Sequence, residues 1–194
     1  VVVAVPPSGW RTISFAPALP PAHQRLQDAM PMGSVVKVQV VFDRPFWRDA
    51  GWSGLVTDDD GPFTFVVDNS QPDVDEGVLA TFLSAQAAVD FGDRSLGPEA
   101  SCRRRALFLD HVARVFGPDI PEPIDYFDRD WGAASWIGGG YSGVMRPGGW
   151  TSCGAALREP VGLIHWASSE SAIAWTGYVD GAIESGQRAA GEVD

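Results

Sequence analysis

The stretch that decides the fold is Gly162-Leu-Ile-His-Trp-Ala-Ser-Ser-Glu-Ser-Ala-Ile-Ala-Trp-Thr-Gly-Tyr-Val-Asp-Gly-Ala-Ile-Glu-Ser-Gly-Gln-Arg-Ala-Ala190. A short apolar strand over residues 163–167 leads into a turn of small polar residues that carries Glu170. The pattern then predicts a helix that begins near Gly177, whose free N–H groups and positive dipole end can face an electron-rich group. The predicted packing stripe of that helix is Ala182, Ile183, Gly186 and Ala189. Such a stretch suits a cofactor site, and it also fits a plain terminal helix after an edge strand.

The composition is that of a folded, acidic chain. Its 194 residues, 45% of them hydrophobic, can bury a core. The net charge of −11 argues against nucleic-acid binding, and the cluster Arg103-Arg104-Arg105 is predicted to be a solvated helix face. No run of eighteen apolar residues occurs, so we expect no transmembrane segment. Two cysteines without ligand spacing predict no metal site, and a reducing cytoplasm is the expected location.

The strongest predicted strand covers residues 33–42. Alternation puts Val36, Val38, Val40 and Phe42 on one face and Lys37, the only lysine, on the other. Lys37 is then either a lysine on a wet sheet face or one that points into a cavity. Other elements are predicted from turn residues and periodicity. They are buried strand 1–5, extended residues 10–15, helix 21–30, strands 54–57, 63–68 and 78–84, helix 98–116, extended residues 121–127 and helix 152–158.

Residues 128–150 are rich in glycine and tryptophan and lack periodicity. They form either an aromatic-anchored surface loop or a loop that brings ring faces up to a ligand. Together with Met32-Gly-Ser-Val-Val-Lys37 and Trp175-Thr-Gly-Tyr178, the segment Gly138-Gly-Gly-Tyr141 resembles the flavin amine oxidases, the monoamine and polyamine oxidase family. The resemblance runs along essentially the whole chain and covers roughly the C-terminal half of such an enzyme.

This resemblance implies roles for individual residues. Tyr141 and Tyr178 match the two aromatic residues that face each other before the flavin, and Lys37 matches the lysine that holds a water against it. These three are the expected catalytic residues, and Trp131, Tyr141 and Tyr178 are the expected substrate-binding residues. The expected cofactor-binding residues are Lys37, Trp131, Ser169, Glu170, Trp175, Gly177, Tyr178 and Val179.

The family chemistry implied is oxidation of an amine by hydride transfer to flavin N5. The product is an imine, which water converts to an aldehyde and ammonia, and O2 reoxidises the flavin to give hydrogen peroxide. Gly140 stands where animal monoamine oxidases carry the cysteine bonded to the flavin, so FAD is expected to be non-covalent. Ser168-Ser169-Glu170 replaces the usual Gly-Thr-Glu.

The resemblance also predicts the organisation of the chain. The Gly-x-Gly-x-x-Gly turn that grips the ADP half of the cofactor does not occur in this sequence, so an N-terminal FAD-binding half or a partner chain is expected to supply it. The fold class predicted is α+β: a mainly antiparallel sheet with covering helices. We expect a substrate-binding domain over residues 1–150, and a strand-turn-helix over residues 151–194 that contributes to the FAD site. A homodimer is a further expectation.

Two alternatives stay open. The chain could be a truncated, catalytically inactive homologue or one chain of a split flavoprotein, acting as a binding or assembly module. Alternatively the substrate is an L-amino acid or a polyamine, in which case Arg146 is the one arginine of the aromatic loop placed to bind a carboxylate.

Overall fold

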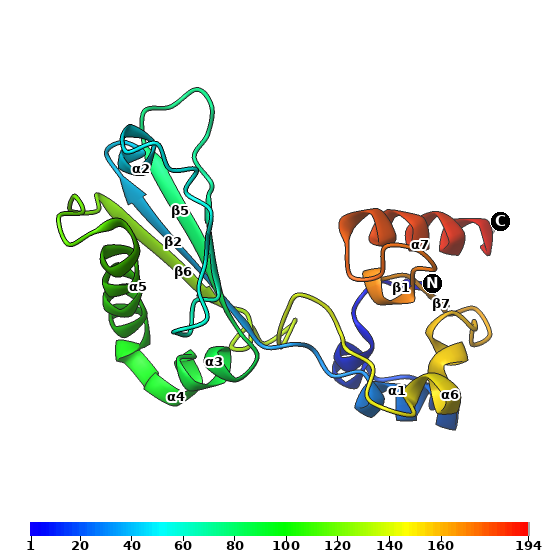
Figure 1. Ribbon diagram of the computed structural model, residues 1–194. Helices are drawn as coiled ribbons and strands as arrows, with labels where there is room; N and C mark the ends of the chain where they lie inside the picture. The colour runs from blue at the N-terminus through cyan, green and yellow to red at the C-terminus, as the bar shows by residue number, and fades with distance from the viewer. Residues whose placement is uncertain (194) are drawn as a thin grey trace. The chain divides into compact units, whose positions relative to one another are not determined.

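The computed structural model describes residues 1–193, except for the side chain of residue 96. It divides the chain into two units, drawn in Figure 1. The sheet unit is Ser34–Ala133, and the split unit combines Val1–Gly33 with Ala134–Asp194. Residues 1–33 pack with the C-terminal segments in one core, and the predicted functional division at residue 150 stays a prediction.

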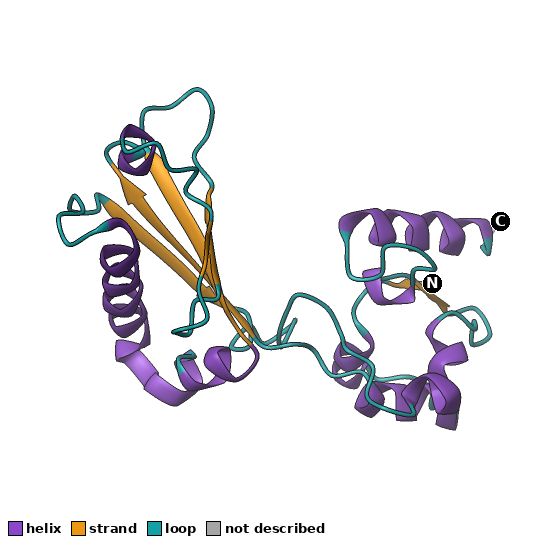
Figure 2. Ribbon diagram, viewed as in Figure 1, coloured by secondary structure: helices purple, strands orange, loops and turns teal. Residues whose placement is uncertain are grey.

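The sheet unit is built on a five-stranded sheet, coloured by element type in Figure 2. The strand order is β3 (Val56–Thr57), β4 (Phe65–Asp68), β5 (Gly77–Ser84), β2 (Val35–Phe42) and β6 (Asp125–Asp130). Every neighbouring pair is antiparallel, as the hairpin pattern predicts. The remaining elements are helices α2 (Phe46–Asp49), α3 (Ala85–Asp90), α4 (Asp93–Leu96), η2 (Gly97–Glu99) and α5 (Ala100–Phe116).

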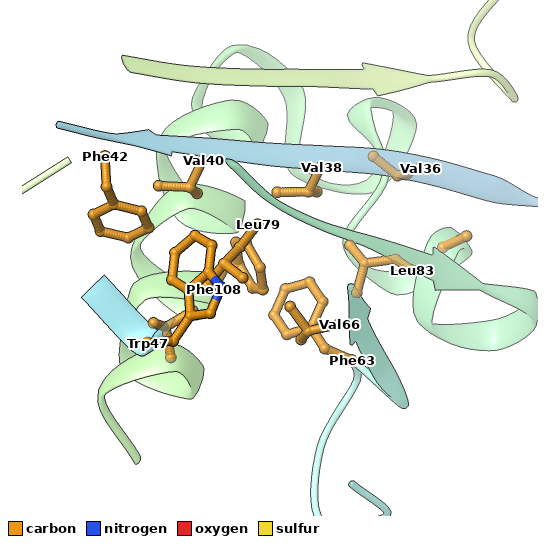
Figure 3. Packing of buried hydrophobic residues seen from close by; sticks show 12 residues of the cluster. Val36, Val38, Val40, Phe42, Trp47, Phe63, Val66, Leu79, Leu83 and Phe108 are labelled. Atoms are coloured by element: carbon orange, nitrogen blue, oxygen red, sulfur yellow. The ribbon is translucent and has the colours of Figure 1, made fainter. Parts of the chain in front are cut away.

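The core of the sheet unit lies between one face of β2 and helix α5 (Figure 3). Val36, Val38, Val40 and Phe42 are fully buried, so the predicted alternation is confirmed. Phe108 of α5 packs against Phe63 with ring centroids 5.0 Å apart. Burial of each large apolar side chain contributes roughly 1.5–3 kcal/mol relative to exposure, which makes this cluster the main stabilising element of the unit.

One prediction for α5 is wrong. Arg104 is 1% exposed and not part of a solvated face. Its guanidinium donates to Asp128 and Asp93, each at 2.8 Å, and Tyr126 donates to the same Asp128 carboxylate at 2.8 Å. Burial alone would raise the pKa of Asp128, but the bonds from Arg104 and Tyr126 outweigh it and hold that pKa below its usual value. The helix therefore buries a charged residue because two carboxylates neutralise it.

Helical spacing in the sequence predicts a packing face of α5 made of Cys102, Ala106, Leu109, Ala113 and Phe116, and this prediction is wrong in part. Cys102 is exposed, and Leu109 and Phe116 are only partly buried. The buried face is shifted by two positions because Arg104 faces the Asp93 and Asp128 carboxylates. The buried residues of the helix are Ala100, Arg104, Phe108, His111 and Val112.

The split unit joins the two ends of the chain. Strand β1 (Val2–Val3) pairs in parallel with β7 (His165–Trp166), within the predicted strand 163–167. Both residues of β7 are buried, but the ends of the predicted strands 1–5 and 163–167 are not, since Val1 is 80% and Leu163 83% exposed. The other elements are η1 (Pro7–Thr12), α1 (Pro21–Ala29), α6 (Gly149–Cys153), η3 (Gly154–Leu157), η4 (Ser169–Ser171) and α7 (Val179–Gly191).

The prediction of extended structure over residues 10–15 is wrong, because Pro7–Thr12 form a 3₁₀ helix. Proline at its first position suits a helix start, since the missing N–H needs no partner there. The turn buries Trp10, which stacks on Trp166 with ring centroids 4.0 Å apart. This stacked pair, with Leu26 and Leu157, forms the core of the split unit.

Among the described residues, no helix combines the length and apolar character that crossing a bilayer requires.

Candidate functional site

The loop that carries Tyr141 is held along the end of the segment before β2. Gly33 donates its N–H to the Ser142 carbonyl at 3.0 Å and accepts from the Gly140 N–H at 2.9 Å. Val144 donates to the Pro31 carbonyl at 2.8 Å. These backbone bonds resemble a short antiparallel pairing, and they fix the backbone on both sides of Tyr141.

Gly33 allows this close approach. A Cβ at Gly33 would lie 2.5 Å from the carbonyl oxygen of Gly140, a distance that side-chain carbons do not tolerate. The glycine in the motif Met32-Gly-Ser-Val-Val-Lys37 therefore has a packing reason within the split unit.

The segment that carries Tyr178 touches the same loop. Gly177 has φ +85°, in the left-handed region that favours glycine, and a Cβ there would lie 2.9 Å from the Ser142 hydroxyl. The Tyr178 N–H donates to the Trp175 carbonyl at 3.0 Å, and their rings meet edge to face at 5.9 Å. The residues next to Tyr141 and Tyr178 are thus in contact, so the two tyrosine-bearing segments form one surface.

The aromatic rings of this surface are exposed to solvent. Tyr141 is 62% and Tyr178 66% exposed, and Trp175 is 67% exposed. Desolvation nevertheless raises the pKa of the Tyr141 hydroxyl above its ordinary value. Ring faces that reach the surface can contact a planar or cationic ligand.

The turn η4 is hydrogen-bonded to both tyrosine-bearing segments. The Glu170 side chain is buried, and its Oε1 accepts from the Gly143 N–H at 2.9 Å. The Ser169 carbonyl accepts from the Gly177 N–H at 3.2 Å. Ser168, where the family pattern has glycine, has φ −171°, which is extended backbone that any residue adopts. The Ser168 departure is therefore accommodated without strain.

Helix α7 begins at Val179, close to the predicted start near Gly177. Its N-cap residue is Tyr178, and no side chain caps the first turn. An uncapped start leaves backbone N–H groups without intrahelical partners, next to the exposed rings.

The predicted packing stripe of α7 is mostly wrong. The buried residues are Gly181, Ser185 and Ala189, whereas Ile183 is 55% exposed. A Cβ at Gly181 would lie 3.0 Å from the Ala172 Cβ, so the helix approaches the chain after η4 at a glycine. The face of α7 that packs closely is the one with small residues, and these are not all hydrophobic. A pattern of apolar residues therefore predicts the wrong face.

Two arginines that sequence reasoning missed anchor this region. Arg158 donates to the Ser171 carbonyl at 2.8 Å, and Arg188 donates to the Trp166 carbonyl at 2.7 Å. Glu192 accepts from Arg188 at 2.5 Å and lies 2.9 Å from the His165 ring. The i, i+4 spacing of Arg188 and Glu192 was a visible signal, whereas nothing local marks Arg158.

Lys37 and Trp131 belong to the sheet unit. Lys37 is half-buried on the face opposite the core, beside a hollow of about 90 Å³, and its ammonium lies 6.0 Å from the Phe82 ring. The Arg129 guanidinium lies 5.7 Å from the Trp131 ring. Because these residues and the two tyrosines are in different units, their grouping around one site stays a prediction.

Arg146 lies in the split unit beside a polar cavity of about 360 Å³ that Arg11, Asp28 and Trp136 also line. Tyr141 and Tyr178 are not among the residues that line this cavity. The role of Arg146 as a carboxylate ligand stays a prediction.

Comparison with known protein families assigns the chain to one of them. Residues 1–194 match the family model of the flavin containing amine oxidoreductases, and the chain belongs to that family. The resemblance seen in the motifs is thereby confirmed.

Individual relatives cover the whole chain. It is 43% identical over 193 residues to a Mycobacterium tuberculosis protein provisionally named as a flavin-containing monoamine oxidase, covering 100% of this chain and 41% of that protein. It is 39% identical over 194 residues to an L-amino acid dehydrogenase of Synechocystis, covering 97% and 39%. A solved structure of putrescine oxidase bound to putrescine superposes with a TM-score of 0.90 at 35% identity, covering 99% and 42%.

The chain thus spans about two fifths of the length of the relatives that it matches.

Proposed function

We propose that the chain forms the C-terminal part of an FAD-dependent amine oxidase and supplies the substrate side of its active site. The observation that carries this proposal is the contact between the segments of Tyr141 and Tyr178, through Ser142 and Gly177, which exposes both rings on one surface. Family membership supports the flavin and the amine.

The surface suits FAD. Exposed rings, the left-handed turn at Gly177 and the uncapped start of α7 offer stacking faces and backbone N–H donors to an electron-rich group. The residues that would hold the cofactor are Lys37, Trp131, Ser169, Glu170, Trp175, Gly177, Tyr178 and Val179. Bound FAD supplies the redox chemistry: uptake of hydride from the α-carbon of the amine, and reoxidation by O2 to hydrogen peroxide. Gly140 offers no thiol, so binding is non-covalent.

The chain's own residues prepare the amine. The ring faces of Tyr141 and Tyr178 attract a cationic amine by roughly 0.5–2 kcal/mol per contact. An apolar enclosure completed by the N-terminal half would then disfavour the charged form, so that the amine gives up a proton and becomes reactive. Trp131 lines the same region in this proposal, and Lys37 holds a water at the flavin.

The test uses the polypeptide that joins this chain to an N-terminal FAD-binding half, with amine-dependent peroxide release as the measurement. We expect Lys37→Met to slow turnover by roughly 10²-fold or more, as loss of a positioned proton-transfer group does. Arg103→Met removes the same charge from an exposed position of α5 and is the matched control. Unchanged turnover in Lys37→Met would remove this lysine from the mechanism.

A second candidate is a binding or assembly module without catalysis. It is favoured by the exposed apolar side chains near α7, among them Ile173 at 73% and Val179 at 77%. The visible absorbance of the purified chain separates the two, because bound oxidised flavin is yellow. A chain that gains flavin only with a partner favours the split-protein form.

The substrate class can be determined by assaying the completed protein with a panel of primary amines, polyamines and L-amino acids. Similarity to a putrescine oxidase and to an L-amino acid dehydrogenase supports testing both of the latter classes. A cytoplasmic location and a homodimer remain predictions.

A further inference from the structure

Glu170 lies between the two tyrosine-bearing segments. Its side chain is 2% exposed. Oε1 accepts from the Gly143 N–H at 2.9 Å, two residues after Tyr141, and Oε2 accepts from the Ser169 hydroxyl at 3.2 Å. Donors of the chain itself therefore engage both carboxyl oxygens.

The same turn also holds the other tyrosine-bearing segment. The Ser169 carbonyl accepts from the Gly177 N–H at 3.2 Å, directly before Tyr178. One residue of η4 thus binds the Tyr141 loop while its neighbour binds the Tyr178 segment.

The turn is itself anchored. Ser168 and Ser171 form a reciprocal capping box around η4. Arg158 donates to the Ser171 and Ala172 carbonyls, each at 2.8 Å. Because η4 is fixed by these bonds, a side chain that extends from it can hold a loop in a defined place.

The Glu170 side chain packs closely against the backbone at Gly143. Gly143 is buried, and a Cβ there would lie 3.3 Å from the Glu170 Cγ and 3.1 Å from the Met30 Cγ. A buried N–H needs an acceptor, and the close packing leaves the Glu170 oxygen in that role.

We propose that Glu170 is a positioning residue, whose carboxyl group holds the Tyr141 loop in register with the Tyr178 segment. This role rests on the proposed function in one respect: it assumes that the rings of Tyr141 and Tyr178 flank the flavin. The hydrogen bond itself is independent of any cofactor.

The test is residue-resolved amide hydrogen exchange in the 194-residue chain. Glu170→Met keeps the volume but lacks the acceptor, and we expect the Gly143 amide to exchange about tenfold faster or more. Glu170→Gln keeps an acceptor oxygen, and we expect it to retain protection. Amides of helix α1, such as Leu26, report that the split unit is still folded.

A second measurement follows the Tyr141 hydroxyl by NMR. Partial desolvation raises its pKa, so in Glu170→Met that pKa is expected to move back toward the ordinary value, whereas Glu170→Gln leaves it in place. Tyr126, in the sheet unit, is buried and donates to Asp128, both of which raise its pKa, so its resonances should stay unshifted over this pH range in all variants.

Two results overturn the inference: unchanged Gly143 exchange in Glu170→Met, or equal loss of protection in Glu170→Gln. FAD binding is measured separately, by quenching of flavin fluorescence with the N-terminal half present. Absence of flavin binding in the parent protein contradicts the proposed function and leaves the exchange result standing.

Discussion

The two units differ in how completely each buries its own apolar residues. The sheet unit, one continuous segment, closes a core in which Trp47, Phe63 and Phe108 are fully buried. The split unit is assembled from two segments and leaves Trp136 at 81% and Leu163 at 83% exposed. Each unit has its own core, but the predicted site residues are divided between them: the sheet unit carries Lys37 and Trp131, and the more exposed split unit carries both tyrosines.

The largest expected effect is a loss of stability of the sheet unit. Arg104→Ala leaves Asp128 and Asp93 without their buried partner, and we expect a loss of about 3–5 kcal/mol in the free energy of unfolding. Urea unfolding followed by amide exchange in both units measures it. The exposed neighbour in Arg103→Ala should change stability by less than about 0.5 kcal/mol. Equal effects of the two variants would contradict the buried network.

The next effect falls on the split unit. Gly33→Ala places a Cβ against the Gly140 carbonyl, and we expect a loss of about 1–3 kcal/mol, confined to amides of the Tyr141 loop and its neighbours. Exchange in β5 should stay unchanged. Destabilisation of the sheet unit instead would show that the two regions are not independent.

A smaller effect depends on pH. His111, the one histidine of the sheet unit, is buried, and burial with nearby Arg114 lowers its pKa, which Asp58 opposes. Below about pH 6.5, His111 therefore binds a proton more readily in the unfolded chain than in the folded protein. Stability of the sheet unit should fall as pH falls from about 7 to 5.5, by about 1 kcal/mol at most.

The matched variant is His111→Phe, which cannot titrate. Thermal unfolding of the sheet unit should then lose its dependence on pH in this range. A pH dependence that persists in His111→Phe would assign the effect to other groups.

The smallest effect is a gain. Gly186 lies within α7 with no neighbouring atom within 4 Å of the place for a Cβ. Gly186→Ala should stabilise the split unit by roughly 0.5–1 kcal/mol, because alanine restricts the unfolded chain and favours the helix. Thermal unfolding measures it, and a loss of stability would mean that this face of α7 is covered.

The sheet could be predicted from sequence because its signals are local. The alternation of Val36, Val38 and Val40 and the turns between strands decide which face is buried. Arg104 could not be predicted as buried, since its partners Asp93 and Asp128 lie 11 and 24 residues away.

For the candidate site, the motifs identified Tyr141, Glu170 and Tyr178, and the structure brings their segments together. Arg158 was missed because it binds backbone carbonyls, which carry no sequence signal, whereas the spacing of Arg188 and Glu192 could have indicated their ion pair. The roles of all the predicted site residues stay predictions, and Lys37 and Trp131 belong to the other unit.

The parallel pairing of β1 with β7 has a consequence for the order of events during synthesis. Val2 pairs with His165, so this pairing joins residues that are synthesised more than 160 residues apart. The sheet unit, complete at residue 133, can fold in the meantime. The pairing of Val2 and Val3 with β7, by contrast, can form only after translation has passed Trp166.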